Sequence, residues 1–118
     1  MTEAEFSDAV VDLAHLFDWK VAHWAPARTK QGWRTPARYD AKGFPDLVMA
    51  HPKRRLTLFV ELKAGKGRLT DEQIVWRQVL TAATSDTVDT RYHVWRPSDS
   101  DDIARTLSGG KILEWRLT

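Results

Sequence analysis

The segment 56–63 carries the residues with the clearest chemical potential in the sequence. Its apolar and polar residues alternate, so in a β-strand Glu61 and Lys63 point to one face while the leucines and the valine point to the other. Asp46 opens a second predicted strand, and neighbouring strands lie about 4.8 Å apart, so its carboxylate can approach that of Glu61. Two carboxylates and an ammonium group gathered in this way suit metal-assisted hydrolysis of a phosphate ester.

The close approach of Asp46 and Glu61 predicts a cation between them, because two carboxylates at short range repel each other. Mg²⁺ prefers oxygen ligands at about 2.1 Å, and the backbone carbonyl of Leu62 is a candidate further ligand. The metal would polarise a phosphoryl oxygen and acidify a bound water, while Lys63 would orient that water or stabilise the growing charge. The alternative is a surface pair of Glu61 and Lys63 with an unrelated Asp46 in a turn, since Glu-x-Lys alone is common.

The surrounding pattern predicts the elements that position these residues. Apolar residues at three- and four-residue steps predict a helix over 2–17, with Thr2 as N-cap and Glu5 completing a capping box. Further helices are predicted over 70–83, with Thr70 as N-cap, and over 99–107. Strands are predicted over 19–24, 46–50, 56–63 and 91–95, and the tail after Gly110 can add an edge strand. This order predicts an α/β fold in which helices flank a mixed β-sheet.

The formal net charge of +2 conceals an uneven distribution along the chain. Residues 1–19 hold five carboxylates and no Lys or Arg, whereas residues 20–68 hold twelve Lys or Arg against three carboxylates. Such a basic block is typical of a surface that binds nucleic-acid phosphates, with a solvated basic loop as the alternative. Residues 25–43 are predicted to form a long basic loop. The turn around Lys53, Arg54 and Arg55 either contacts the DNA backbone or is only a soluble turn.

The predicted nucleic-acid contacts combine charge with aromatic planes. Trp33 and Tyr39 stand among basic residues in the 25–43 loop, a combination that suits unpaired bases, and folding back onto the domain surface is the alternative. Lys66 and Arg68 closely follow Lys63 and can hold the phosphate that flanks the cleaved bond. The predicted contact set is Arg28, Lys30, Trp33, Arg34, Arg38, Lys66 and Arg68.

Length and composition favour one domain over residues 1–118. No apolar stretch reaches about 18 residues and acidic residues occupy the first positions, so we expect a soluble, intracellular protein with no membrane partner. The absence of cysteine excludes disulfides and thiolate metal sites. No Gly-x-Ser-x-Gly elbow, Walker loop or Gly-x-Gly-x-x-Gly turn supports a small-molecule hydrolase.

The motif segment 44–63 and its flanks carry a family resemblance. Gly43-Phe44-Pro45-Asp46, Val60-Glu61-Leu62-Lys63 and then Gln73 with Trp76 together resemble the PD-(D/E)XK nuclease superfamily. Within it, the chain is most similar to the virus-type replication-repair nuclease domain, VRR-NUC, over about residues 2–97. The resemblance implies a restriction-endonuclease-like fold and DNA cleavage that depends on Mg²⁺ or Mn²⁺. It also implies action on branched DNA, such as Holliday junctions or flaps, in replication, repair or recombination in a bacterial or phage-infected cytoplasm.

Residue by residue, the resemblance implies that Asp46 and Glu61 are metal ligands and that Lys63 is the catalytic lysine. Gln73 matches the polar residue that the family places on the helix after the motif strands, with solvation of the helix surface as the alternative. Trp76, one turn from Glu72 and beside an apolar stripe, is assigned to the core.

The family also places a glutamate on its first helix, where Glu3 and Glu5 compete. Glu3 is favoured because it lies nearly along the apolar stripe, whereas Glu5 lies further round the helix and suits the capping box. Favourable first-turn charge is the alternative for Glu3.

The main rival to a nuclease is a non-catalytic DNA-binding or assembly module on the same fold, and the intact Asp46, Glu61 and Lys63 argue against it. RNA as the substrate stays open. No recognition helix is evident, so we expect recognition by shape. Paired incision of a junction needs two active sites, which suggests a homodimer. The apolar tail residues are candidates for its interface or for an edge strand: Ile112, Leu113, Trp115 and Leu117.

Overall fold

The computed structural model describes residues 1–24, 27–29, 32–34 and 39–110, and for 27–29 and 32–34 it describes the backbone alone. The elements follow one another as α1 (Glu3–Leu16), β1 (Lys20–His23), β2 (Ala27–Thr29), β3 (Gly32–Arg34), β4 (Leu47–His51), β5 (Leu56–Leu62), α2 (Asp71–Thr84), β6 (Thr90–Trp95), a 3₁₀ turn (Pro97–Asp99) and α3 (Ser100–Ser108). The helices and the four strands of the main sheet therefore follow one another in the predicted order, with β2 and β3 inserted between β1 and β4.

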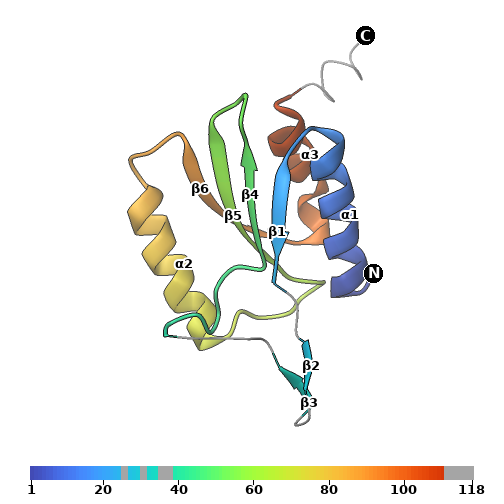
Figure 1. Ribbon diagram of the computed structural model, residues 1–118, viewed down its shortest axis with the longest axis vertical. Coiled ribbons are helices and arrows are strands. Elements are labelled where there is room, and N and C mark those ends of the chain that lie inside the picture. The colour runs from blue at the N-terminus through green and yellow to red at the C-terminus, as the bar shows by residue number, and fades with distance from the viewer. Residues whose placement is uncertain (25–26, 30–31, 35–38, 111–118) are drawn as a thin grey trace.

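A mixed four-stranded sheet in the order β1-β4-β5-β6 forms the centre of the molecule (Figure 1). The first three strands are antiparallel neighbours, while β6 runs parallel to β5. The connection from β5 to β6 is the helix α2, as a parallel pair requires a long crossover. The predicted α/β fold with a mixed sheet and flanking helices is confirmed.

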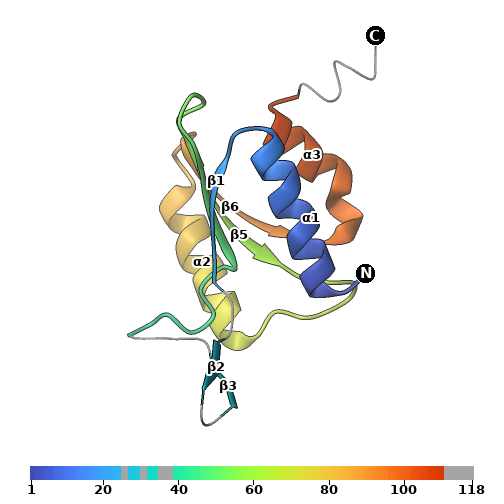
Figure 2. The same ribbon diagram turned by 45° about the vertical axis from the view of Figure 1, so that its right-hand side comes forward.

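Helices α1 and α3 lie together on one face of the sheet (Figure 2). The core lies between them and that face, because the alternation in β5 buries Leu56, Leu58, Val60 and Leu62 there. These residues join the helix side chains Phe6, Val10, Ile103 and Leu107 in one apolar cluster. Their burial is the main driving force for folding, at about 25 cal/mol per Å² of apolar surface.

Helix α2 covers the opposite face and is less deeply packed. Among its described residues only Leu80 is buried, while Val75 and Val79 are 57% and 52% exposed. Phe44 links this helix to the sheet, since its ring makes edge contacts with Phe59 of β5 and Trp76 of α2. Trp76 packs against Phe44 but is only partly buried and does not belong to the core cluster, so its assignment to the core is wrong; its indole N–H donates to the Asp40 carbonyl.

The two long helices begin at the predicted N-caps. Thr2 accepts a hydrogen bond from the Glu5 amide and the Glu5 carboxylate accepts one from the Thr2 amide, which confirms the capping box. Thr70 and Gln73 form an equivalent box at the start of α2. Each box satisfies donors that the first helical turn leaves open.

The prediction of an unstructured loop over 25–43 is wrong in part. Ala27–Thr29 and Gly32–Arg34 pair as an antiparallel two-stranded ribbon, with Thr29 opposite Gly32. A two-residue connection closes a hairpin through local contacts alone, so prolines elsewhere in the segment do not prevent it. The predicted edge strand after Gly110 lies outside the described residues. No helix in the described ranges is long and apolar enough to cross a membrane.

Candidate active site

Asp46 and Glu61 lie side by side at one end of the sheet. The register pairs Leu47 of β4 with Val60 of β5, so the residue before β4 stands beside Glu61. Asp46 Oδ2 accepts a hydrogen bond of 2.8 Å from the amide of Leu62, which fixes its carboxylate against the end of β5. The antiparallel pairing therefore brings together two carboxylates that are fifteen residues apart in the sequence.

Glu61 is almost fully buried, with 1% of its surface exposed. Its Oε1 accepts a hydrogen bond of 2.7 Å from Nε2 of Gln73 on α2. Its Oε2 is also buried and has no hydrogen-bond partner among the described residues. A buried carboxylate with one unsatisfied oxygen is costly, and such groups in native proteins commonly serve a ligand or the chemistry.

The pKa of Glu61 is raised from its ordinary value of 4.5 to about 8. Burial is the largest cause, followed by the negative charge and close approach of the Asp46 side chain, while the positive charge of Lys63 opposes the shift. A cation between the two carboxylates would reverse these effects, because it favours the ionised form of both.

The donor set at Asp46 and Glu61 fits a small divalent cation. It supplies two carboxylates, one of them with an unsatisfied buried oxygen, and the backbone of Leu62 adjoins them. Mg²⁺ typically takes one or two protein carboxylates and completes its shell with water and substrate phosphate. Over the described residues, no group of three or more Asp, Glu or His side chains forms a metal-binding cluster.

Lys63 follows β5 directly and is held through its backbone, because its amide donates to the carbonyl of Trp95 at 3.0 Å. Its side chain is only partly buried and makes no hydrogen bond or ion pair with the described residues. Its positive charge nevertheless acts on Glu61. The ammonium group thus acts electrostatically on Glu61, while its donors have no partner in the part of the chain that the structure describes.

Glu3 and Glu5 occupy different environments at the start of α1. The negative charge of Glu3 contributes to the raised pKa of Glu61, although it is the smallest of the causes. The Glu5 carboxylate instead accepts from the Thr2 amide in the capping box. Glu3 therefore acts weakly on Glu61 through its charge, whereas Glu5 has a local partner in the capping box.

Gln73 bridges the capping box and the site. Its Oε1 accepts from the Thr70 amide at 2.8 Å while its Nε2 donates to Glu61, so both ends of the amide are engaged. A flipped amide would lose both bonds, which fixes the orientation of the side chain. The alternative in which Gln73 only solvates the helix surface is wrong.

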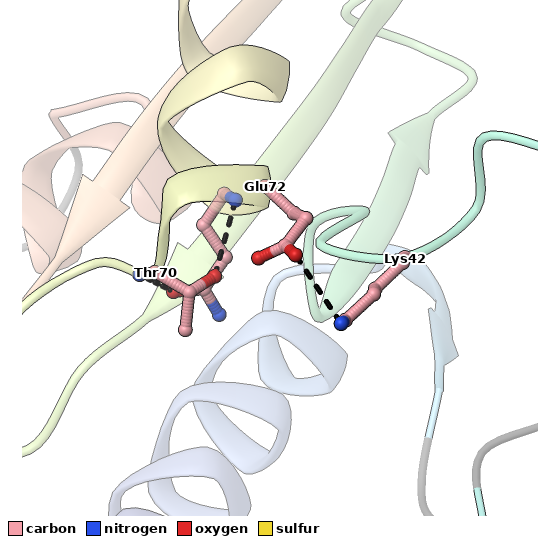
Figure 3. A network of polar contacts seen from close by, with 4 residues as sticks. Lys42, Thr70 and Glu72 are labelled. Carbon is pink, nitrogen blue, oxygen red and sulfur yellow. Dashed lines mark hydrogen bonds and ion pairs between the residues drawn. The ribbon is translucent and has the colours of Figure 1, made fainter.

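The loop before Asp46 packs closely on the first turn of α2. A Cβ added to Gly43 would lie 2.5 Å from the Glu72 carbonyl carbon and 2.7 Å from the Gln73 nitrogen, and Gly43 has φ +83°. Only glycine combines this backbone conformation with so close an approach. Lys42 forms an exposed ion pair of 3.2 Å with Glu72 beside it (Figure 3). The two sequence segments that supply Asp46 and Gln73 are thereby held together.

The predicted DNA-binding residues have different positions. Lys66 and Arg68 are exposed in the loop that follows Lys63. Arg28, Trp33 and Arg34 belong to the β2–β3 ribbon, which projects from the same end of the sheet (Figure 1). Lys30 and Arg38 lie outside the described residues.

Tyr39 is 99% exposed and borders a groove of about 450 Å³ between its loop and the outer side of α2. The groove is lined by Tyr39, Asp40, Lys42, Glu72, Val75, Trp76 and Val79, and includes neither Asp46 nor Glu61. It is therefore separate from the two carboxylates.

Sequence reasoning missed Tyr92 and Arg96, and it placed Arg54 in a turn that either contacts DNA or is only soluble, without its role in the fold. Arg54 caps α3 at the far end of the sheet, where its Nη1 donates to the carbonyls of Thr106 and Leu107. Tyr92 lies beside Phe59 on the site face, and burial followed by the charge of Glu61 raises its pKa to about 12. Arg96 ends β6 next to the Lys63 loop. The period-two alternation over 90–95 would have placed Tyr92 on the same face as the site. No local sequence pattern predicts the carbonyl contacts of Arg54 and Arg96.

The comparison with known proteins agrees with this geometry. The model of the VRR-NUC domain family matches residues 11–91, which is more than half of the chain and includes Asp46, Glu61, Lys63 and Gln73. The chain therefore belongs to the VRR-NUC domain family, a nuclease-type family, and its substrate class is DNA. A search of curated proteins found no match.

Proposed function

We propose that this protein is a divalent-metal-dependent endonuclease that hydrolyses phosphodiester bonds in DNA. The observation that carries the proposal is the buried Oε2 of Glu61 beside Asp46, which has no hydrogen-bond partner among the described residues, together with the positive charge of Lys63, which acts on Glu61. A non-catalytic DNA-binding module would have no need to bury such a group at a cost in stability.

Each residue has a distinct role in the proposed reaction. Asp46 and Glu61, with the Leu62 carbonyl, would hold Mg²⁺ or Mn²⁺, and the bound ion supplies Lewis-acid activation of the phosphodiester and of water. Gln73 orients the Glu61 carboxylate through its fixed amide, and Glu3 adds negative charge from α1. Lys63 orients the attacking water or stabilises the negative charge that develops on the phosphoryl oxygens.

The substrate is proposed to be branched DNA, such as a Holliday junction or a flap. The basic segment 20–68 supplies sequence-independent attraction, and the β2–β3 ribbon extends the protein from the site end. Paired incision of a junction needs two sites, so the proposal includes a homodimer on such DNA. Its suggested interface, the tail at 112–117, lies outside the described residues.

A cleavage assay tests the proposal directly. Labelled junction, flap, single-stranded and linear duplex DNA are incubated with the protein in Mg²⁺, in Mn²⁺ or in EDTA. Metal-dependent cutting that ranks a branched substrate first is expected, and Asp46→Asn should abolish it because the amide retains an acceptor for the Leu62 amide but carries no charge. Binding of every substrate without cutting in either metal would favour the non-catalytic module.

Calorimetry tests the metal ligands independently of activity. Binding of Mn²⁺ should be detected in the wild type and lost in Glu61→Gln, since the amide keeps the shape of the side chain and removes its charge. Equal affinity in the two proteins would reject Glu61 as a ligand.

A further inference from the structure

The loop between β5 and α2, residues 63–70, carries Lys66 and Arg68 with no regular secondary structure. Its two ends are bonded to the flanking elements, through the Lys63 amide to Trp95 and through Thr70 to the first turn of α2. Between them, the backbone has one internal turn bond, from the Gly67 amide to the Ala64 carbonyl at 3.1 Å. Loops with so few internal bonds are normally mobile, and exposed lysines and arginines on a mobile loop lose conformational entropy when they bind phosphate. An anchor outside the loop would lower that cost.

Arg96 provides such an anchor. Its Nη1 donates to the carbonyl oxygens of Gly65 at 3.1 Å and Gly67 at 2.7 Å. Because β6 runs parallel to β5, both strands end at the same edge of the sheet, and Arg96 stands beside the beginning of the loop. The loop carbonyls on either side of Lys66 are thus held by one guanidinium group.

Arg96 is itself fixed in place. Its amide donates to the Asp99 side chain at 2.9 Å, and Pro97 restricts the backbone that follows. Its Nε and Nη2 groups make no hydrogen bond, and its charge meets no carboxylate at salt-bridge distance, within the ranges that the structure describes. The charge of Arg96 therefore adds to that of the loop.

We propose that Arg96 is a positioning residue for DNA binding. It holds the Gly65 and Gly67 carbonyls so that Lys66 and Arg68 present their charges together to the backbone phosphates next to the reacting bond. The inference rests on the proposed function, since it takes DNA as the ligand. A guanidinium is required because both bonds come from Nη1, whose two N–H groups are held in the rigid plane of the guanidinium, whereas a lysine ammonium rotates freely on a flexible stem.

The salt dependence of DNA binding tests the role. Affinity for a labelled DNA junction is measured in EDTA over a range of salt concentrations, for the wild type, Arg96→Lys and Arg96→Gln. Each lost phosphate contact reduces the slope of log K against log salt by about 0.9. If Arg96 positions the loop, Arg96→Lys loses the contacts of Lys66 and Arg68 and its slope falls by about 1.8, although the net charge is unchanged.

Two further variants separate positioning from simple charge. In a Lys66→Gln, Arg68→Gln background, Arg96→Lys should have no additional effect, because the charges that it positions are already absent. Arg91→Gln is the matched control: this exposed arginine lies on the same strand, about 16 Å from Arg96, and should leave the salt slope near that of the wild type.

Hydrogen exchange provides a readout that does not depend on DNA. The Gly67 amide should exchange faster in Arg96→Lys than in the wild type, whereas amides in β5 and α2 should be unchanged. An Arg96→Lys protein with wild-type salt slope and wild-type Gly67 exchange would overturn the inference while leaving the nuclease proposal intact. If the wild type binds DNA but never cuts it, the nuclease proposal fails. The salt dependence of DNA binding then still shows whether Arg96 positions Lys66 and Arg68.

Discussion

Arg54 and Arg96 lie at opposite ends of the same sheet, and each donates from Nη1 to two backbone carbonyls. The end around Arg54 is closed. Trp19 donates its indole N–H to Leu107, the Arg54 guanidinium lies over the Trp19 ring, and both ring nitrogens of buried His51 have backbone partners. Each of these polar side chains therefore forms hydrogen bonds with backbone groups of other segments of the protein.

The end around Arg96 is open by comparison. Glu61 has a buried oxygen without a partner among the described residues, and the side chains of Lys63, Lys66 and Arg68 make no hydrogen bond or ion pair there. Basic and buried polar side chains therefore stabilise the fold at the Arg54 end, whereas at the Arg96 end several of them remain available to a ligand. The buried carboxylate without a partner among the described residues, more than positive charge alone, distinguishes the end that holds the proposed site.

The largest expected difference between the two ends concerns their lysines. Lys63→Gln should lower the cleavage rate by at least about 10²-fold, because it removes a charge placed to stabilise the transition state. Lys53→Gln, which removes an exposed lysine from the β4–β5 turn, should leave the rate within about twofold, since turn charges at a distance are screened by salt. Rates are compared on the same DNA in Mg²⁺. Near-normal cleavage by Lys63→Gln would show that the open end is not the active site.

The raised pKa of Glu61 predicts that the metal-free protein loses stability as pH rises. The folded protein holds this proton up to about pH 8, whereas the unfolded chain releases it near the ordinary value of 4.5. The free energy of unfolding should therefore fall between these pH values, by no more than about 1.4 kcal/mol per pH unit from this group. Urea unfolding in EDTA measures the effect. Glu61→Gln should flatten this part of the profile, and an identical slope in both proteins would contradict the raised pKa.

Alanine substitutions at Gly43 and Gly65 test how closely the loop before Asp46 packs on helix α2 at the open end. Gly43→Ala and Gly65→Ala both place alanine at positive φ, at a cost of about 1 kcal/mol or more, but only the first also meets the backbone of α2. Gly43→Ala should thus reduce the unfolding free energy clearly more than Gly65→Ala, and it should weaken cleavage by separating Gln73 from Asp46. Equal losses in the two variants would mean that the close approach at Gly43 is easily relieved.

The smallest effect is expected at the closed end. Arg54→Gln should reduce stability by about 1–2 kcal/mol through loss of its carbonyl bonds and of the contact with Trp19. Its cleavage rate and DNA affinity should stay close to those of Arg55→Gln, the neighbouring exposed control. A large loss of DNA binding in Arg54→Gln alone would assign the closed end to the substrate as well.

Local patterns were enough to predict most of the fold. Apolar periodicity and capping residues located α1 and α2, and alternation assigned the core face of β5. These features depend on contacts within a few residues, which the sequence displays directly. The β2–β3 ribbon escaped prediction because its short strands carry little alternation and lie in a segment rich in prolines and charges.

The sequence by itself determined which chemical groups could form a site: Asp46, Glu61 and Lys63 follow from residue type, strand period and spacing. Only the tertiary structure determined their burial, their hydrogen bonds and the pKa of Glu61. Burial raises the pKa of Glu61 and leaves one of its oxygens without a partner in the described ranges, and the Gln73 amide binds the other oxygen. The roles of Arg54 and Arg96 were decided in the same way, because each contacts carbonyls about thirty or more residues away. Desolvation and long-range hydrogen bonds depend on which segments meet in space, and no local pattern records that.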